Sequence, residues 1–157
     1  IYTLSLHDAL PILAYNKSGT VRKTSDVYAL ATAVLFQSSV QHFALAPNNL
    51  TDAPDWAIDF MKKVPTTWDE VRFIDGYPGR YAVLARRAGS QWFVAGINAQ
   101  TEPVTLTLSL PMFERGAELT VYSDDAALQG SVTTAKLNKK QQMTVTIPTN
   151  GAVVVKN

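Results

Sequence analysis

The strongest constraint on the fold is a change in the spacing of apolar residues near Pro65. Before this residue, apolar side chains recur every three or four positions, as on one face of a helix; after Trp68 they alternate, as in strands. Proline stops helices because it lacks an N–H group and disfavours the helical conformation of the residue before it. The stretch 64–98 therefore predicts a boundary between a helical part and a β part.

Two helices are predicted before this boundary. Residues 25–44 carry apolar side chains at helical spacing, with Ser25 or Thr24 as the N-cap. The centre of this helix is apolar on nearly all sides, so we expect other parts of the protein to cover it from more than one direction. The second helix is predicted over residues 52–64, with Asp52 at its start.

After Trp68 the sequence is typical of short strands. The predicted strands are residues 70–75, 81–87, 91–98, 103–110, 118–123, 131–137, 142–148 and 152–156. Most of them alternate between apolar and polar residues, whereas 81–87 and 91–98 are apolar on both faces, which is typical of central strands. The predicted fold class is therefore mainly β: an antiparallel β-sandwich of about eight strands preceded by two helices.

Composition narrows the classes of function. The apolar content of 46% and the charged content of 17% are those of a chain that buries an ordinary core. A net charge of +1 creates no field that would attract nucleic acid, and no apolar run approaches the roughly 20 residues of a membrane span. The chain has no cysteine, which excludes disulfides, thiolate metal sites and a cysteine nucleophile.

Two pairs of carboxylates are candidates for catalysis. Glycosidic hydrolysis needs two carboxyl groups held about 5 to 10 Å apart across a cleft. Asp69 and Glu70 are neighbours and point to opposite faces if they lie in a strand. Asp124 and Asp125 have the same geometry and are predicted to lie in a turn. No catalytic residue is predicted in this chain.

Metal and histidine chemistry have little support in the sequence. Asp52, Asp55 and Asp59 are interpreted as residues of a helix start and a solvated helix face, so no metal ligand is assigned. His42 has no evident partner, and His7 lies in an N-terminal segment that is interpreted as non-native below.

Four larger side chains were assigned by their surroundings. Tyr77 lies between glycine and proline in a predicted turn, and we hypothesise that it contacts a glycan or a neighbouring domain. Trp92 lies in a run that is apolar on both faces and is predicted to be a core residue. Of Arg86 and Arg87, one is predicted to be solvated and the other to pack against the helical part.

Three segments carry a recognisable pattern. Residues 24–41 read T-S-D-V-Y-A-L-A-T-A-V-L-F-Q-S-S-V-Q, residues 64–87 read V-P-T-T-W-D-E-V-R-F-I-D-G-Y-P-G-R-Y-A-V-L-A-R-R, and residues 91–98 read Q-W-F-V-A-G-I-N. Together they resemble the C-terminal end of glycoside hydrolase family 97. The most specific elements of the resemblance are Pro65, Trp68, Asp69, Gly76, Gly79, Tyr81, Arg86, Trp92 and Gly96. Six of these, Trp68, Asp69, Gly76, Gly79, Arg86 and Trp92, are assigned structural or interdomain roles.

The resemblance implies a larger parent enzyme. Members of the family are bacterial α-glucosidases or α-galactosidases with an N-terminal β-sandwich, a central (β/α)₈ barrel and a C-terminal β-domain. Residues 14–64 are then expected to be the last helical part of the barrel, and 65–157 the C-terminal sandwich. Residues 1–13 resemble the translated read-through of a sequencing adapter and are interpreted as a non-native leader.

Function is expected to reside mostly outside this chain. The family's catalytic carboxylates and calcium-binding glutamates lie upstream of the matched region, so the resemblance implies calcium and a periplasmic or exported location for the parent only. The expected partners are the missing barrel and N-terminal domains, the oligosaccharide substrate of the parent and a second copy in a homodimer. Leu45 stands where many members have aspartate, which leaves inverting glucosidase and retaining galactosidase chemistry both open. The alternative is a stand-alone carbohydrate-binding or protein-interaction module.

Overall fold

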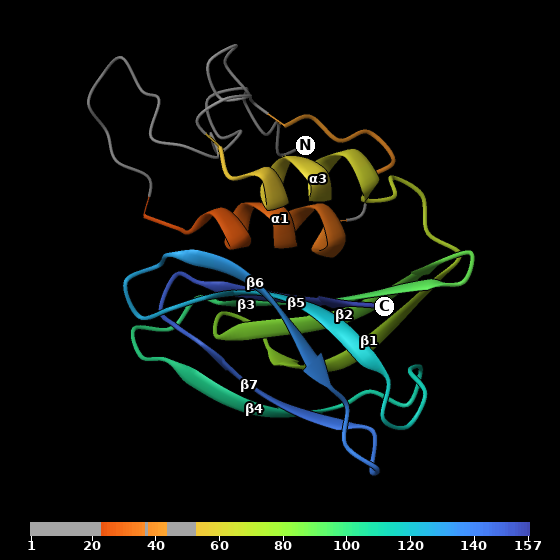
Figure 1. Ribbon diagram of the computed structural model, residues 1–157. Helices are drawn as coiled ribbons and strands as arrows, with labels where there is room; N and C mark the ends of the chain where they lie inside the picture. The colour runs from red at the N-terminus through yellow and green to blue at the C-terminus, as the bar shows by residue number, and fades with distance from the viewer. Residues whose placement is uncertain (1–22, 37, 44–52) are drawn as a thin grey trace.

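Three layers make up the fold in a computed structural model that describes residues 23–36, 38–43 and 53–157 (Figure 1). Within these residues, helices α1 (Asp26–Leu35) and α3 (Asp55–Lys63) form the first layer, a six-stranded sheet the second and a two-stranded sheet the third. The strands are β1 (Glu70–Tyr77), β2 (Tyr81–Ala88), β3 (Gln91–Asn98), β4 (Val104–Ser109), β5 (Glu118–Asp124), β6 (Gly130–Lys136), β7 (Gln142–Ile147) and β8 (Ala152–Lys156). The predicted fold class is confirmed.

The two sheets are unequal in size. The large sheet has the order β1-β2-β3-β8-β5-β6, the small sheet pairs β4 with β7, and all pairs are antiparallel. The last strand of the chain is therefore inserted between β3 and β5. Strands β2 and β3 are interior strands of the large sheet, as their apolar faces predict.

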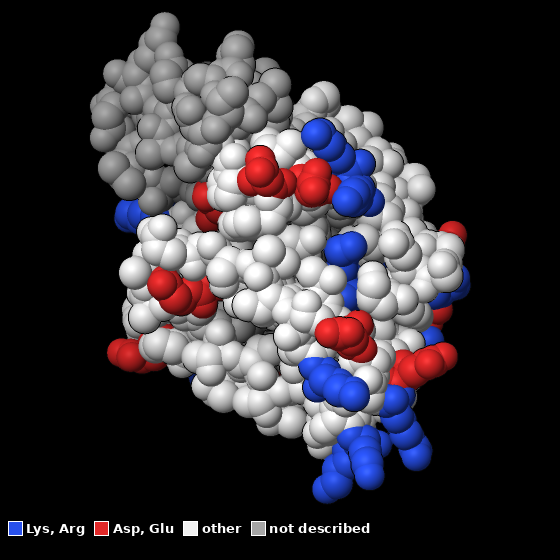
Figure 2. Space-filling view, viewed as in Figure 1, with Lys and Arg blue, Asp and Glu red and all other residues white. Residues whose placement is uncertain are grey.

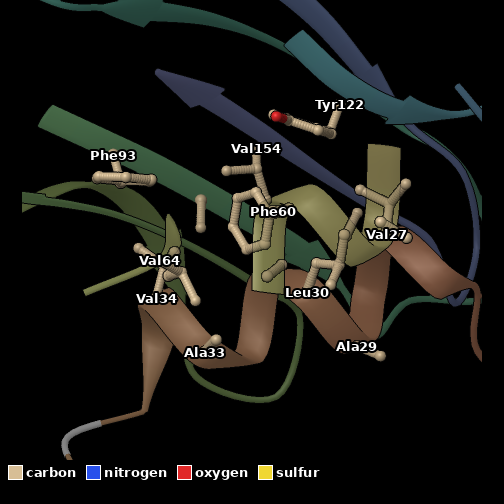
Figure 3. Packing of buried hydrophobic residues seen from close by; sticks show 14 of the residues in the cluster. Val27, Ala29, Leu30, Ala33, Val34, Phe60, Val64, Phe93, Tyr122 and Val154 are labelled. Atoms are coloured by element: carbon tan, nitrogen blue, oxygen red, sulfur yellow. The ribbon is translucent and has the colours of Figure 1, made fainter. Parts of the chain in front are cut away.

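Each face of the large sheet is buried against a different layer. The face toward the small sheet packs Val83, Val94, Val153 and Val155 against Leu106, Leu108, Val145 and Ile147. The face toward the helices packs Phe93, Ala95, Tyr122 and Val154 against α1 and α3 (Figure 3). The helices thus cover the inner strands of one face, and the two-stranded sheet packs on the other face.

Helix α1 is shorter than predicted. It begins after the expected N-cap Ser25, whose Oγ accepts the N–H of Tyr28 at 2.9 Å. It ends at Leu35, and Phe36 is already extended, whereas the prediction ran to residue 44. Residues 38–43 are not helical, and the side-chain amide of Gln41 donates to the carbonyl of Ala33 at 2.7 Å. The apolar spacing continues past the helix, but Val40 is exposed and only Phe43 of this segment packs against the core, so periodicity alone does not mark the end of the helix.

Helix α3 begins later than predicted. Its N-cap is Pro54, whose carbonyl accepts the N–H groups of Ala57 and Ile58, and no side chain caps it. The predicted start, Asp52, lies outside the described residues. The helix ends at Lys63, directly before Val64 and Pro65, as the proline rule predicts.

Both Asp124 and Asp125 were expected in a turn, but only Asp125 lies in one. Asp125 Oδ1 accepts the N–H groups of Ala127 and Gln129 in a turn. Asp124 instead ends β5, is buried, and accepts hydrogen bonds from Ser25 Oγ and from the N–H of Ala152. This carboxylate therefore joins the start of α1 to the strands β5 and β8.

Replacing Ser25 by alanine is expected to lower the free energy of unfolding by about 2 kcal/mol, because the helix loses its N-cap and Asp124 loses a hydrogen bond. Urea denaturation measures the change. Ser38 is the matched control, since it is an exposed serine whose Oγ bonds only to the backbone of Val40. Ser38→Ala is expected to change the value by less than about 0.5 kcal/mol. Equal effects at both serines would contradict the role of the Asp124 contact.

Candidate docking surface

The helical layer leaves part of the large sheet open. Helix α1 packs against β2, β3, β5 and β8. On edge strand β1, Val71 and Phe73 pair with Arg86 and Leu84, two residues of β2 that face the helices. Val71 and Phe73 therefore point to the helical side of the sheet, yet they are 46% and 68% exposed.

Most of the large exposed apolar side chains of the described residues gather at this place. We define the apolar strip as Phe36, Val40, Val71 and Phe73. The two parts of the strip adjoin, because Ser38 and Ser39 line one shallow hollow together with Trp68, Val71 and Arg86.

A second hollow, of about 310 Å³, lies at the hairpin end of the strip. Its walls include Phe73, Tyr77, Arg80, Ala82 and Ile97. The guanidinium carbon of Arg80 lies 5.2 Å from the centre of the Tyr77 ring, so the one charged wall residue is stacked on an aromatic neighbour. The hollow is thus lined largely by apolar surface.

Glycine allows the β1–β2 hairpin to close tightly. Gly76 has φ +146° and Gly79 has φ +77°, and a Cβ on Gly76 would lie 2.8 Å from the carbonyl oxygen of Tyr81. Asp75 Oδ1 accepts the N–H of Gly76 at 2.7 Å and the hydroxyl of Tyr81 at 3.2 Å. Burial and the nearby Asp75 carboxylate raise the pKa of Tyr81. This closure ends β1 at Tyr77, which is 63% exposed.

Arg86 connects the sheet to the helical layer. It is 1% exposed, and its guanidinium donates to the carbonyls of Leu35 at 2.9 Å and Phe36 at 3.0 Å, where α1 ends. Burial lowers the pKa of the guanidinium, but arginine remains protonated in proteins. Arg87 is partly exposed and pairs with Glu70 at 3.2 Å. The structure thus places one arginine against the helical part and one toward solvent, as the sequence predicts.

Trp68 and Trp92 lie on opposite faces of the large sheet. Trp68 packs edge-to-face on Phe93 at 5.5 Å, on the helical side. Trp92 is buried between the sheets, as predicted, with Arg72 4.7 Å from its ring centre. The sequence analysis did not identify Phe73 as an exposed residue. Its strand alternates between apolar and charged residues, and this pattern shows which face is apolar but not whether another element covers that face.

The carboxylates of this region are already engaged. Hydrogen bonds from Arg72 at 2.6 Å and Arg87 at 3.2 Å hold the pKa of Glu70 below its usual range. Asp69 Oδ2 accepts the N–H of Gly89 at 2.7 Å and so ties the start of β1 to the β2–β3 turn. Among the described residues, no group of three histidine or acidic side chains is arranged to hold a metal ion. Nor does this part of the chain contain a helix long and apolar enough to span a membrane.

Comparison with known proteins identifies the chain. The family described as "Glycosyl-hydrolase 97 C-terminal, oligomerisation" matches residues 67–156. The chain belongs to glycosyl hydrolase family 97. The resemblance noted in the sequence is thereby confirmed, since residues 67–156 match the C-terminal region of this family.

The chain spans between about a tenth and a quarter of the length of the three relatives described next. A probable retaining alpha-galactosidase of Streptomyces bingchenggensis is 36% identical over 53% of this chain and 13% of its own length. A retaining alpha-galactosidase of Bacteroides thetaiotaomicron is 40% identical over 43% of this chain and 10% of its own length. The crystal structure of a beta-arabinopyranosidase is 49% identical, with a TM-score of 0.84 over 88% of this chain and 22% of that protein.

Proposed function

We propose that this region is the non-catalytic docking domain of a family 97 enzyme. The observation that carries the proposal is the contrast between engaged carboxylates and uncovered apolar surface. Glu70 and Asp69 are held by Arg72, Arg87 and Gly89, whereas Phe73 and Tyr77 are exposed with no cover from the described residues. Such a surface stabilises a protein by excluding water from a contact rather than by performing acid–base chemistry.

The hollow beside Tyr77 supports a protein contact better than a glycan contact. Sugars require several free hydrogen-bonding groups as well as an aromatic ring. Here Asp75 Oδ1 is engaged by Gly76 and Tyr81, and Arg80 is stacked on Tyr77. The sequence suggested that Tyr77 contacts either a glycan or a neighbouring domain, and we propose the neighbouring domain.

For the parent enzyme we propose hydrolysis of terminal α-galactosides or β-L-arabinopyranosides. The support is the names of the relatives, two galactosidases and an arabinopyranosidase, and the last is 49% identical over 88% of this chain. The two sugars are chemically close, because L-arabinopyranose has the ring configuration of D-galactopyranose and lacks only the hydroxymethyl group. Retaining chemistry and an exported location of the parent belong to this proposal.

The full-length parent tests this proposal with the nitrophenyl derivatives of α-galactose, β-L-arabinopyranose and α-glucose. One of the first two is expected to have a kcat/KM at least about tenfold above that of the glucoside, because the glucoside carries its C4 hydroxyl in the opposite configuration and would leave a hydrogen-bonding group of the site unpaired. Faster cleavage of the glucoside would contradict it. The 157-residue chain is expected to show no turnover. Turnover that disappears when its own carboxylates are changed to amides would overturn the non-catalytic role.

A further inference from the structure

We propose that the slot between β3 and β5 is a binding site for an extended apolar strand, filled here by β8, and that the domain closes only when this strand is in place. Among the described strands, β8 alone joins the half of the large sheet that contains β3 to the half that contains β5 (Figure 1). It runs antiparallel to both neighbours. Without β8 the large sheet is two separate pieces, each with an open edge.

Strand β8 contributes to both cores of the domain. Its first four residues are at most 1% exposed. Val153 and Val155 lie in the core between the two sheets, whereas Ala152 and Val154 lie in the core under the helices. Burial of apolar side chains is the main favourable term in folding. Removal of this one strand therefore opens both cores at once.

Hydrogen bonds hold the strand at both of its ends. At its start, Asp124 Oδ2 accepts the N–H of Ala152 at 2.8 Å. At its end, the side-chain oxygen of Asn157 accepts the N–H of Trp92 at 2.8 Å. Successive side chains of a strand point to opposite faces, so a slip by one residue would turn Val154 away from the helices. These two contacts therefore fix which side chain enters which core.

The slot is suited to an uncharged strand with branched side chains. Gly96 of β3 lies opposite Val153, and a Cβ on this glycine would lie only 3.3 Å from Cγ1 of the valine, so the small residue leaves room for the larger one. Figure 2 shows acidic and basic side chains interspersed on one face of the molecule, whereas residues 150–155 carry no charge. The slot therefore recognises its strand by apolar shape, since a charge buried there would have no partner.

The position of β8 in the sequence delays the closure of the large sheet. The strand follows both of its neighbours in the chain, and a tight turn, in which the N–H of Gly151 donates to the carbonyl of Pro148 at 3.0 Å, leads to it from the small sheet. Until β8 has been synthesised, β3 and β5 are open edges, which can pair with strands of other chains. A chain that stops before β8 is therefore expected to aggregate, and a strand of the right sequence supplied from outside is expected to rescue it.

Complementation by a separate strand tests the proposal. A chain that ends at Thr149 is produced together with a soluble carrier protein that bears residues 150–157 at its end. The amount of soluble truncated chain that co-purifies with this carrier is expected to be at least about tenfold greater than with a carrier whose strand has Val154→Asp, because the slot would bury the new charge. A carrier that bears residues 130–136, the exposed edge strand β6, is the matched control and is expected not to rescue the chain.

Three outcomes would overturn the proposal: equal rescue by all carriers, a truncated chain that is soluble and folded without any carrier, or a truncated chain that stays insoluble with every carrier. The intact chain provides the second measurement. There Val154→Asp is expected to abolish the folded product, whereas Val132→Asp on β6, where the side chain is 40% exposed, is expected to retain at least about half of it. Similar yields of the two variants would also contradict the closing role of β8.

Discussion

Replacing Phe60 by alanine is expected to lower the free energy of unfolding by about 4 kcal/mol, the cost of removing a large aromatic side chain from a closed core. Phe60 of α3 is 2% exposed and lies between α1 and the large sheet (Figure 3). Its ring meets Tyr122 at 5.1 Å and Phe93 at 6.2 Å, both edge-to-face. Because these contacts join the helical layer to two separate strands, their loss is expected to loosen the whole layer. Urea denaturation followed by tryptophan fluorescence measures the effect.

Phe36→Ala is the matched control for this variant. Phe36 is also a phenylalanine next to a helix, but it is 52% exposed. Its replacement is expected to change the unfolding free energy of the monomer by less than about 1 kcal/mol. Similar losses at both positions would show that Phe60 does not hold the helices on the sheet.

Arg86→Met is expected to lower the free energy of unfolding by about 3 kcal/mol. The substitution keeps much of the apolar stem but removes the two charged hydrogen bonds to the carbonyls of Leu35 and Phe36. These carbonyls form the negative end of the α1 dipole and have no intrahelical partner, so a buried positive charge stabilises them strongly. Amide hydrogen exchange of α1, together with chemical denaturation, measures the loss.

The neighbouring arginine supplies the control. Arg87 is partly exposed and pairs with Glu70 and Asp69 at the surface, where ion pairs typically contribute about 0 to 1 kcal/mol. Arg87→Met is therefore expected to cost less than about 1 kcal/mol. A larger loss at Arg87 than at Arg86 would contradict the assignment of Arg86 as the contact that holds the C-terminal end of α1.

The two ends of α1 are held by opposite charges of the large sheet. Asp124 of β5 accepts a hydrogen bond from the N-cap Ser25, and Arg86 of β2 donates to the carbonyls at the other end. Each charge has the sign that complements the nearby end of the helix dipole. This arrangement also changes the interpretation of the apolar centre of α1. Its cover comes from the sheet and α3, so its composition alone does not require neighbours from a missing barrel. Whether residues 14–64 belong to the barrel stays a prediction.

Sequence alone determined the local features of this protein. The change of period at Pro65, the alternating runs and the turn residues predict the strands within two positions and α3 within three, whereas α1 ends nine positions before its predicted end. Runs apolar on both faces identify β2 and β3 as interior strands, and the resemblance identifies the family. These features depend on residues that are close together in the chain, so a local pattern is enough to reveal them.

Only the tertiary structure decided which distant residues meet. Ser25 and Asp124 are separated by 99 positions, and Arg86 and Leu35 by 51, so neither contact leaves a periodic trace in the sequence. The insertion of β8 between β3 and β5 and the division into six and two strands are decided by long-range pairing as well. The same holds for the apolar strip: alternation makes one face of β1 apolar, but whether that face is covered depends on where α1 and α3 lie, and they stop short of it.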